Sequence, residues 1–289
     1  MRQCWNSLEL MGQVLLKQMY LSMAKKLVDK CPVDIESYYS DYIDIKNKEN
    51  TDSRYVGKES YYHASGIGTC SRKLYYQSVE QAKPTNLPDD KSKRIMRLGS
   101  VVHEDIQDAL IYIYNNILLH KEKNNLKKKV KFHIEKEIII EQLNVRGFYD
   151  CVVEQSELGL NKVYLLDFKT IGSYPYKLKF GKNPNPNPSI HQELQLGTYG
   201  YAIKKEFGQL DGMYLYYYNK DTSVLRPQPV PLSYVDLAYN YWYGINQEHK
   251  KGLPPIREGT SPVQKWSCNY CEFADLCGSP FKTKWGSDD

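Results

Sequence analysis

The feature that most constrains this fold is an apolar segment, Val163–Thr170, that carries two charged residues near its end, Asp167 and Lys169. Side chains alternate between the two faces of a β-strand, so Asp167 and Lys169 point the same way and Phe168 packs on the other side. A charge at the end of a buried strand is costly unless it has a partner, a metal ion or a reaction to serve. The segment therefore predicts a buried strand that carries a functional site at one end.

A second carboxylate, Asp150, lies in Gly147-Phe148-Tyr149-Asp150 on the preceding predicted strand. Hard divalent ions bind carboxylates, carbonyls and water, so Asp150, Asp167 and the Phe168 carbonyl are candidate ligands of one ion. Such an ion would stabilise the charge that grows in phosphodiester hydrolysis and activate a water molecule. Lys169 would orient that water or offset the charge. The acid-x-Lys triplet occurs four times in the chain, but only at 167–169 does it end an apolar strand.

Length and composition set broad limits on the class of protein. The chain has 289 residues, 41% apolar and 25% charged, enough for one large domain or a domain with a helical extension. It has no run of 18 apolar residues and no signal-peptide pattern at its start, so we expect a cytoplasmic protein of a bacterium or a phage-infected host cell, with no membrane helix. In that compartment the seven cysteines are expected to be ligands rather than disulfides. The net charge of +5 leans mildly toward an anionic partner.

Hydrophobic periodicity and turn residues predict the order of elements. Helices are expected at 6–30, 97–120, 189–207 and 233–250, and strands at 130–140, 143–154, 162–170, 210–219 and 223–231. Residues 34–62 read as loops with short helices, 84–93 as a linker, and 172–188 as a long loop because prolines repeat at its end. No phosphate-binding loop of a nucleotide-driven motor is present.

Two helices carry further candidate residues. His103 shares the apolar stripe of the helix at 97–120 with Ile106 and Leu110, so it is either a hydrogen-bonded core residue or a ligand for an ion such as Mn²⁺. Gln195 and Tyr199 are four residues apart and lie on one helical face. A carboxamide and a phenol can hold a phosphate or a nucleotide without adding charge, although ordinary packing explains the pair equally.

The C-terminal tail contains the pattern C-x2-C-x5-C at Cys268, Cys271 and Cys277. Two thiolates separated by two residues bind one metal ion or cluster, and a complete site needs a fourth ligand. We favour Cys70 for that position, with Cys4, Cys31 and Cys151 as competitors. The spacing does not separate zinc from an iron–sulfur cluster. In either case the metal or cluster would connect Cys70 to the C-terminal tail and so join two ends of the domain. Metal binding would then be coupled to folding.

Taken together, these motifs resemble RecB-type nucleases of the PD-(D/E)XK superfamily. The resemblance rests on the order of His103, Asp150, the Asp167-Phe168-Lys169 triplet and Gln195-x-x-x-Tyr199. The split cysteine set resembles the iron–sulfur branch, which includes the AddB nuclease domain and the CRISPR-associated exonucleases. The resemblance runs from about Ser65 to Cys277.

The resemblance implies an α/β fold with a restriction-endonuclease-like mixed sheet of four or five strands flanked by helices. Residues 1–64 would form a helical extension of unknown role, and 65–289 the nuclease domain with a cysteine-rich tail at 266–280. The resemblance further implies Mg²⁺ or Mn²⁺ held by His103, Asp150 and Asp167, a catalytic Lys169, and DNA contacts by Gln195 and Tyr199. It implies a [4Fe-4S] cluster on Cys70, Cys268, Cys271 and Cys277. Glu137, with Glu135 in competition, would match a further acid.

We therefore expect a DNA exonuclease that acts on single-stranded ends, in recombination, repair or phage DNA processing and alongside recombination or replication partners. Two alternatives stay open: a non-catalytic DNA-binding or adaptor protein that keeps the fold, and a zinc-stapled endonuclease. We expect the proline-rich loop at 183–188 to border the DNA path.

Overall fold

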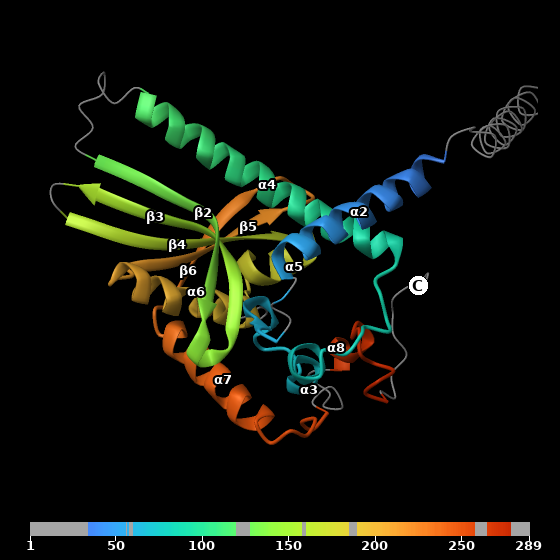
Figure 1. Cartoon of the computed structure of the whole chain (residues 1–289). Coiled ribbons are helices and arrows are strands. Elements are labelled where there is room, and N and C mark those ends of the chain that lie inside the picture. The colour runs from blue at the N-terminus through green and yellow to red at the C-terminus, as the bar shows by residue number, and fades with distance from the viewer. Residues whose placement is uncertain are drawn as a thin grey trace, which may run out of the picture. The chain divides into compact units, whose positions relative to one another are not determined.

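The computed structural model describes residues 34–55, 57, 60–119, 128–157, 160–184, 190–257 and 265–278 (Figure 1). The chain divides into two compact units, Met1–Asn50 and Thr51–Asp289. The helix expected at 6–30 lies outside the described residues, and so do residue 189, the first of the helix expected at 189–207, and most of the proline-rich loop, 185–188.

In the first unit, a helix begins where loops were expected. Helix α2 spans Ile35–Tyr55 and is continuous, so the prediction of loops with short helices at 34–62 was wrong. The Asp34 carboxylate accepts a hydrogen bond from the Ser37 amide at 3.0 Å, which satisfies an amide at the start of the helix. One turn from the end of the unit, Lys46 Nζ lies 2.8 Å from Glu49. Among residues 35–50 of this helix, Ile43 is the one apolar side chain that is buried, so no continuous apolar stripe revealed the helix in the sequence.

The second unit is built on a six-stranded mixed sheet, against the four or five strands expected. Its strands are β1 (Tyr62–His63), β2 (Lys128–Ile140), β3 (Val145–Glu157), β4 (Leu160–Ile171), β5 (Gly212–Asn219) and β6 (Leu225–Val230). They follow the order β1-β3-β4-β5-β6, and β2 pairs with β3 as an antiparallel hairpin. β4 and β5 run parallel, while β3 with β4 and β5 with β6 are antiparallel. The strands predicted from the sequence are confirmed.

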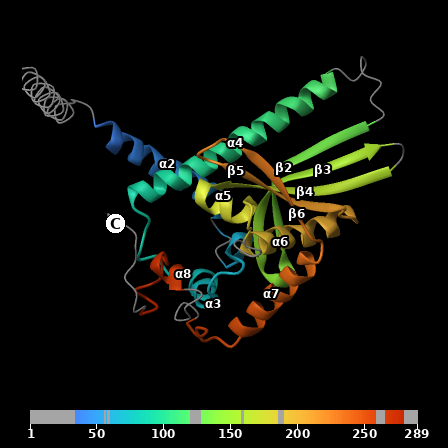
Figure 2. The same ribbon diagram turned by 180° about the vertical axis from the view of Figure 1, so that it is seen from behind.

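Helices cover both faces of this sheet (Figures 1 and 2). The long helix α4 (Asp90–Leu119) lies along one side, and α6 (Ile190–Phe207) and α7 (Tyr234–His249) lie along the other. The main core forms between the sheet and α6 and α7, around fully buried side chains such as Leu165, Leu196 and Trp242. The remaining helices are α3 (Ser71–Leu74), α5 (Ser173–Phe180) and α8 (Lys265–Asn269). None of the described helices is both long and apolar enough to span a membrane.

Helix α5 corrects the prediction of an unbroken loop at 172–188. Pro175 is tolerated because it lies in the first turn, where an amide has no partner within the helix. The Ser173 amide at the helix start instead donates to Asp221 Oδ2 at 2.7 Å. Phe180, at the other end, packs against the core with its ring 5.5 Å from that of Tyr217. Tertiary contacts therefore order a segment that its proline content marks as irregular.

Close packing of α6 on β3 depends on Gly147. A Cβ atom at this position would lie 2.9 Å from the Cβ of Ala64 and 2.9 Å from the Tyr199 ring. Neither neighbour is the mobile end of a flexible chain, since Ala64 and Tyr199 are both buried in the main core. The absence of a side chain at Gly147 is thus what allows the tyrosine to lie against the strand just ahead of Asp150.

We expect Gly147→Ala to lower the free energy of unfolding by about 1–3 kcal/mol, because the added methyl group overpacks a filled core. Gly244→Ala is the matched control. Gly244 is an exposed helical position where an added Cβ atom would meet nothing within 4 Å, so alanine there should stabilise the helix by up to about 1 kcal/mol. Urea denaturation measures both, and equal effects of the two substitutions would contradict the packing argument.

Candidate active site

Strands β3 and β4 bring the two aspartates together. Cys151 pairs with Leu166 in the antiparallel ladder, so Asp150 and Asp167 follow opposite each other at the next position. The Asp150 carboxylate reaches across and accepts a hydrogen bond from the Phe168 amide at 2.6 Å. Asp150 is 8% exposed and Asp167 1% exposed, so two carboxylates lie side by side in a largely buried setting.

Lys169 is the ion-pair partner of Asp167. Its Nζ lies 2.7 Å from Asp167 Oδ2, which confirms that the two side chains point the same way from β4. Burial raises the pKa of Asp167 to about 6, with Lys169 opposing and Asp150 adding to the shift. Burial would lower the pKa of Lys169, but the charges of Asp167 and Asp150 outweigh it and raise this pKa overall. Lys169 is therefore held as an ammonium ion beside the acids.

Helix α4 places His103 at the same point. Its Nδ1 lies 3.6 Å from Asp150 Oδ2, and its ring meets the Phe168 ring edge-on at 6.3 Å. Burial lowers the pKa of His103, but the hydrogen bond and charge of Asp150 outweigh this effect and raise the pKa overall. The structure thus joins the imidazole, through Asp150 and Phe168, to the strand that carries Asp167 and Lys169.

The acids at 135 and 137 have different partners. Glu137 pairs with the buried Arg146, with Oε1 3.1 Å from the arginine Nε. Glu135 lies opposite Asp150 in the β2–β3 register, at a gap in the ladder where its own φ is +49°. Gln107 of α4 donates to the Glu135 carboxylate at 2.7 Å, one helical turn beyond His103. Of the two candidates, Glu135 is therefore the one that lies beside Asp150 and is tied to the helix of His103.

Gln195 and Tyr199 contact each other on α6. The Gln195 amide donates to the Tyr199 hydroxyl at 3.0 Å. Tyr199 is only 3% exposed and belongs to the main core, whereas Gln195 is half-buried. In this arrangement the phenol orients the carboxamide, and Gln195 is the member of the pair that remains accessible.

The donor set fits a hard divalent ion, although it is not gathered around one point. Among the residues that the structure describes, no three His, Cys, Asp or Glu side chains are arranged as a ready-made metal site. Asp167 is instead paired with Lys169, and His103 with Asp150. Two adjacent buried carboxylates and an imidazole nonetheless offer the oxygen and nitrogen donors that Mg²⁺ or Mn²⁺ would accept. A divalent cation would also relieve the repulsion between the two acids.

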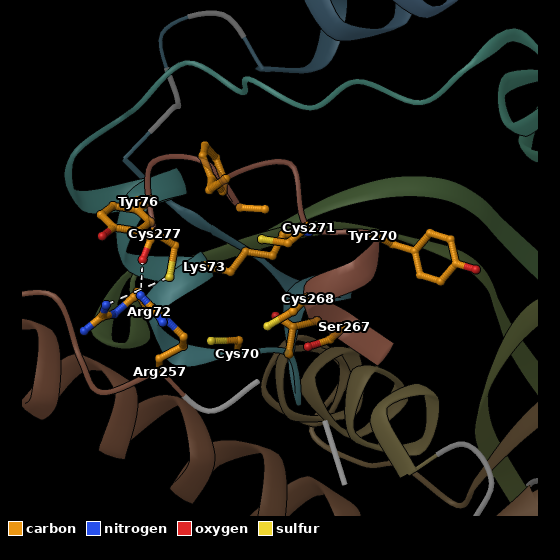
Figure 3. A pocket seen from close by; sticks show the side chains of 13 residues that line it. Cys70, Arg72, Lys73, Tyr76, Arg257, Ser267, Cys268, Tyr270, Cys271 and Cys277 are labelled. Atoms are coloured by element: carbon orange, nitrogen blue, oxygen red, sulfur yellow. Dashed lines mark hydrogen bonds between the residues drawn. The ribbon is translucent and has the colours of Figure 1, made fainter. Parts of the chain in front are cut away.

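A second candidate site lies away from the acids, where four cysteines line one cavity of about 120 Å³ (Figure 3). Cys70 comes from the start of α3, Cys268 from α8, and Cys271 and Cys277 from the tail. Arg72 Nη1 lies 3.9 Å from the Cys277 sulfur, and Arg257 donates to the Cys277 carbonyl.

The competing cysteines do not reach this cavity or are not described. Cys151 is fully buried in β3, where burial raises the pKa of its thiol to about 12. Cys4 and Cys31 lie outside the described residues. The five described cysteines form no disulfide.

The family comparison agrees with the arrangement of the acids. A family model for the PD-(D/E)XK nuclease superfamily matches residues 115–278, more than half of the chain. This protein belongs to the PD-(D/E)XK nuclease superfamily. The matched region contains Asp150, Asp167 and Lys169. Members of this superfamily are nucleases that act on DNA and generally use divalent metal ions.

Solved structures show more distant similarity, and no curated protein sequence matches the chain. The crystal structure of SSO0001 has 16% identity and a TM-score of 0.48, covering 84% of this chain and 98% of that one. An alkaline exonuclease from Laribacter hongkongensis has 12% identity and a TM-score of 0.42, covering 70% of this chain and 94% of that one.

We expect Mg²⁺ or Mn²⁺ to raise the thermal midpoint of the wild-type protein but not of Asp167→Ala. A ligand at 100 times its Kd adds about 2.7 kcal/mol to folding stability, and each kcal/mol moves the midpoint of a chain this long by about 2–4 °C. Asp108→Ala, which removes an exposed carboxylate from the middle of α4, is the control and should keep the shift. Differential scanning calorimetry measures the shift of the thermal midpoint. An equal shift in Asp167→Ala would show that the ion binds away from Asp167.

Proposed function

We propose that this protein is a Mg²⁺- or Mn²⁺-dependent DNA exonuclease of the RecB type, acting on single-stranded ends in recombination, repair or phage DNA processing. The observation that carries the proposal is a group of two buried acids, Asp150 and Asp167, with the half-buried Lys169 2.7 Å from Asp167 and His103 3.6 Å from Asp150. A structural role alone would not repay the burial of two acids and an ammonium ion, since apolar residues of similar size fill a core at lower cost.

Each residue has a role that its surroundings support. Asp150, Asp167 and His103 would hold the divalent ion, which when bound supplies the Lewis acid and the activated water of the reaction. Asp167 keeps Lys169 charged and fixes its Nζ beside the acids, where it can orient the attacking water and stabilise negative charge on the phosphate. Gln195, oriented by Tyr199, would contact the DNA strand next to this site.

We further propose that Cys70, Cys268, Cys271 and Cys277 hold a [4Fe-4S] cluster, which would place the protein in the iron–sulfur branch of RecB-type nucleases. All four thiols line one cavity. A [4Fe-4S] cluster is held by four cysteine thiolates, and this cavity offers that number. Arg72, Lys73 and Arg257 line the same cavity and would offset the negative charge of thiolates.

We expect Asp167→Ala and Lys169→Ala to reduce cleavage of single-stranded DNA by at least about a hundredfold, because each removes a group that acts on the transition state. Far-UV circular dichroism should show a native fold. Lys162→Ala is the matched control, since Lys162 is an exposed lysine on the same strand and should keep full activity. End-labelled and circular single strands are the substrates.

Two outcomes would count against this proposal. Cleavage by Asp167→Ala at the wild-type rate would remove the acids from the mechanism. Efficient cutting of the circular strand would show an endonuclease instead, because a circle offers no end.

Anaerobically purified wild-type protein should be coloured and contain about four iron and four sulfide per chain. We expect Cys70→Ser and Cys271→Ser to lose most of this iron, because each removes one ligand. Cys151→Ala should retain it, since the Cys151 thiol is buried away from the cavity. Metal analysis and visible absorption provide the measurement, and stoichiometric zinc without sulfide would favour the zinc alternative.

A further inference from the structure

Lys179, on α5, is a lysine with an unusual environment. Its side chain is only 9% exposed, and its Nζ lies 4.7 Å from the centre of the Tyr217 ring. The ammonium group nonetheless reaches solvent, since it is not among the fully buried atoms that lack a hydrogen-bond partner. The chain thus holds one positive charge in a nearly buried position.

The sheet places this charge beside the candidate active site. Tyr217 of β5 is the register partner of Lys169 of β4, so in this parallel pair the two side chains lie on the same face, one strand apart. Neighbouring strands are about 4.8 Å apart. Lys179, which sits over Tyr217, therefore lies beside Lys169 on the side away from Asp150. His191, at the start of α6, links the two lysines electrostatically, because after burial their charges are what lower its pKa most.

In the described part of the chain, no carboxylate forms an ion pair with Lys179. Among the described residues, no acid lies within ion-pair distance of its Nζ. Glu193 is the acid whose charge acts on it most, but that carboxylate already accepts a hydrogen bond from Gln228 at 2.8 Å and is engaged by Tyr234. Burial accordingly lowers the pKa of Lys179, with Glu193 only partly opposing the shift.

A nearly buried ammonium ion without a counter-ion destabilises the fold unless an anion binds to it. The Tyr217 ring offers a weaker compensation than a carboxylate would. Lys169 is already paired with Asp167, and the described residues offer Lys179 no carboxylate at ion-pair distance, so an anion that completes Lys179 would come from outside the described part of the chain.

We propose that Lys179 binds a backbone phosphate of the DNA strand, next to the phosphodiester bond that is cleaved. This inference rests on the proposed nuclease function and extends it by naming a phosphate subsite formed by α5 and β5. The strand would run from the acids past Lys169 toward α5, and Lys179 would fix its register without reading its sequence.

The test compares Lys179→Met with Lys204→Met. Methionine keeps an apolar stem at either position, and Lys204 is an exposed lysine on α6. Binding of oligo(dT) is measured across a series of KCl concentrations, with Ca²⁺ in place of Mg²⁺. Loss of one phosphate contact should reduce the slope of log K against log salt by about 0.7 in Lys179→Met, with affinity about tenfold weaker. Lys204→Met should match the wild type, and Lys179→Arg should restore the slope.

An unchanged slope in folded Lys179→Met would overturn the proposal and leave Lys179 a purely structural residue that stacks on Tyr217. The wild-type protein gives an independent result if that variant does not fold. Bound oligo(dT) should slow amine modification of Lys179, but not of Lys204, as measured by mass spectrometry, and equal rates with and without DNA would also overturn it. Wild-type protein that binds oligo(dT) but does not cleave it in Mg²⁺ would reject the nuclease function alone. Wild-type protein that does not bind oligo(dT) would reject both.

Discussion

The ion pair between Asp167 and Lys169 is the interaction on which the rest of the site depends. Both groups project from β4, an interior strand of the sheet. A charged side chain without a partner would destabilise the fold at such a position. Pairing keeps Lys169 charged, while Asp150 across the ladder raises the pKa of Asp167 beyond the effect of burial. One ammonium ion thus faces two carboxylates, and this excess of negative charge would favour a bound cation.

Helix α4 turns that imbalance into a defined site, because three of its residues at four-residue spacing face three different strands. Gly99 is opposite Thr170 of β4, where a Cβ would come within 3.2 Å of the hydroxyl. His103 meets Asp150 of β3, and Gln107 holds Glu135 of β2. Residues four apart lie on one helical stripe, so the packing of this single helix on the sheet positions both His103 and, through Gln107, Glu135.

The parts predictable from the sequence are those with a strong local signal. The apolar run of β4 and the Asp167-x-Lys169 triplet identify the strand and the facing of its charges, and the register then brings Asp150 alongside. Glu135 was harder to choose over Glu137, because the choice depends on a backbone kink at φ +49° and on Gln107, neither of which has a sequence signature. Helix α5 was missed for a related reason, since its order comes from Asp221 and the core contact of Phe180. Lys179 could not be singled out before that helix was known.

The cysteine cavity is tied to the sheet by contacts that need no metal. Ser71, next to Cys70, hydrogen-bonds with His249 of α7 at 3.0 Å, and the other nitrogen of that imidazole meets the Tyr62 hydroxyl of β1 at 2.7 Å. Tyr75, Tyr76 and Phe273 form a small core of their own beside the cavity, separate from the core under the sheet. A cluster bound by the thiols would thus close the tail onto α3 and stabilise this smaller core. Asp150, Asp167 and Lys169 lie instead on strands that pack on the larger core, so each site is next to a different hydrophobic cluster.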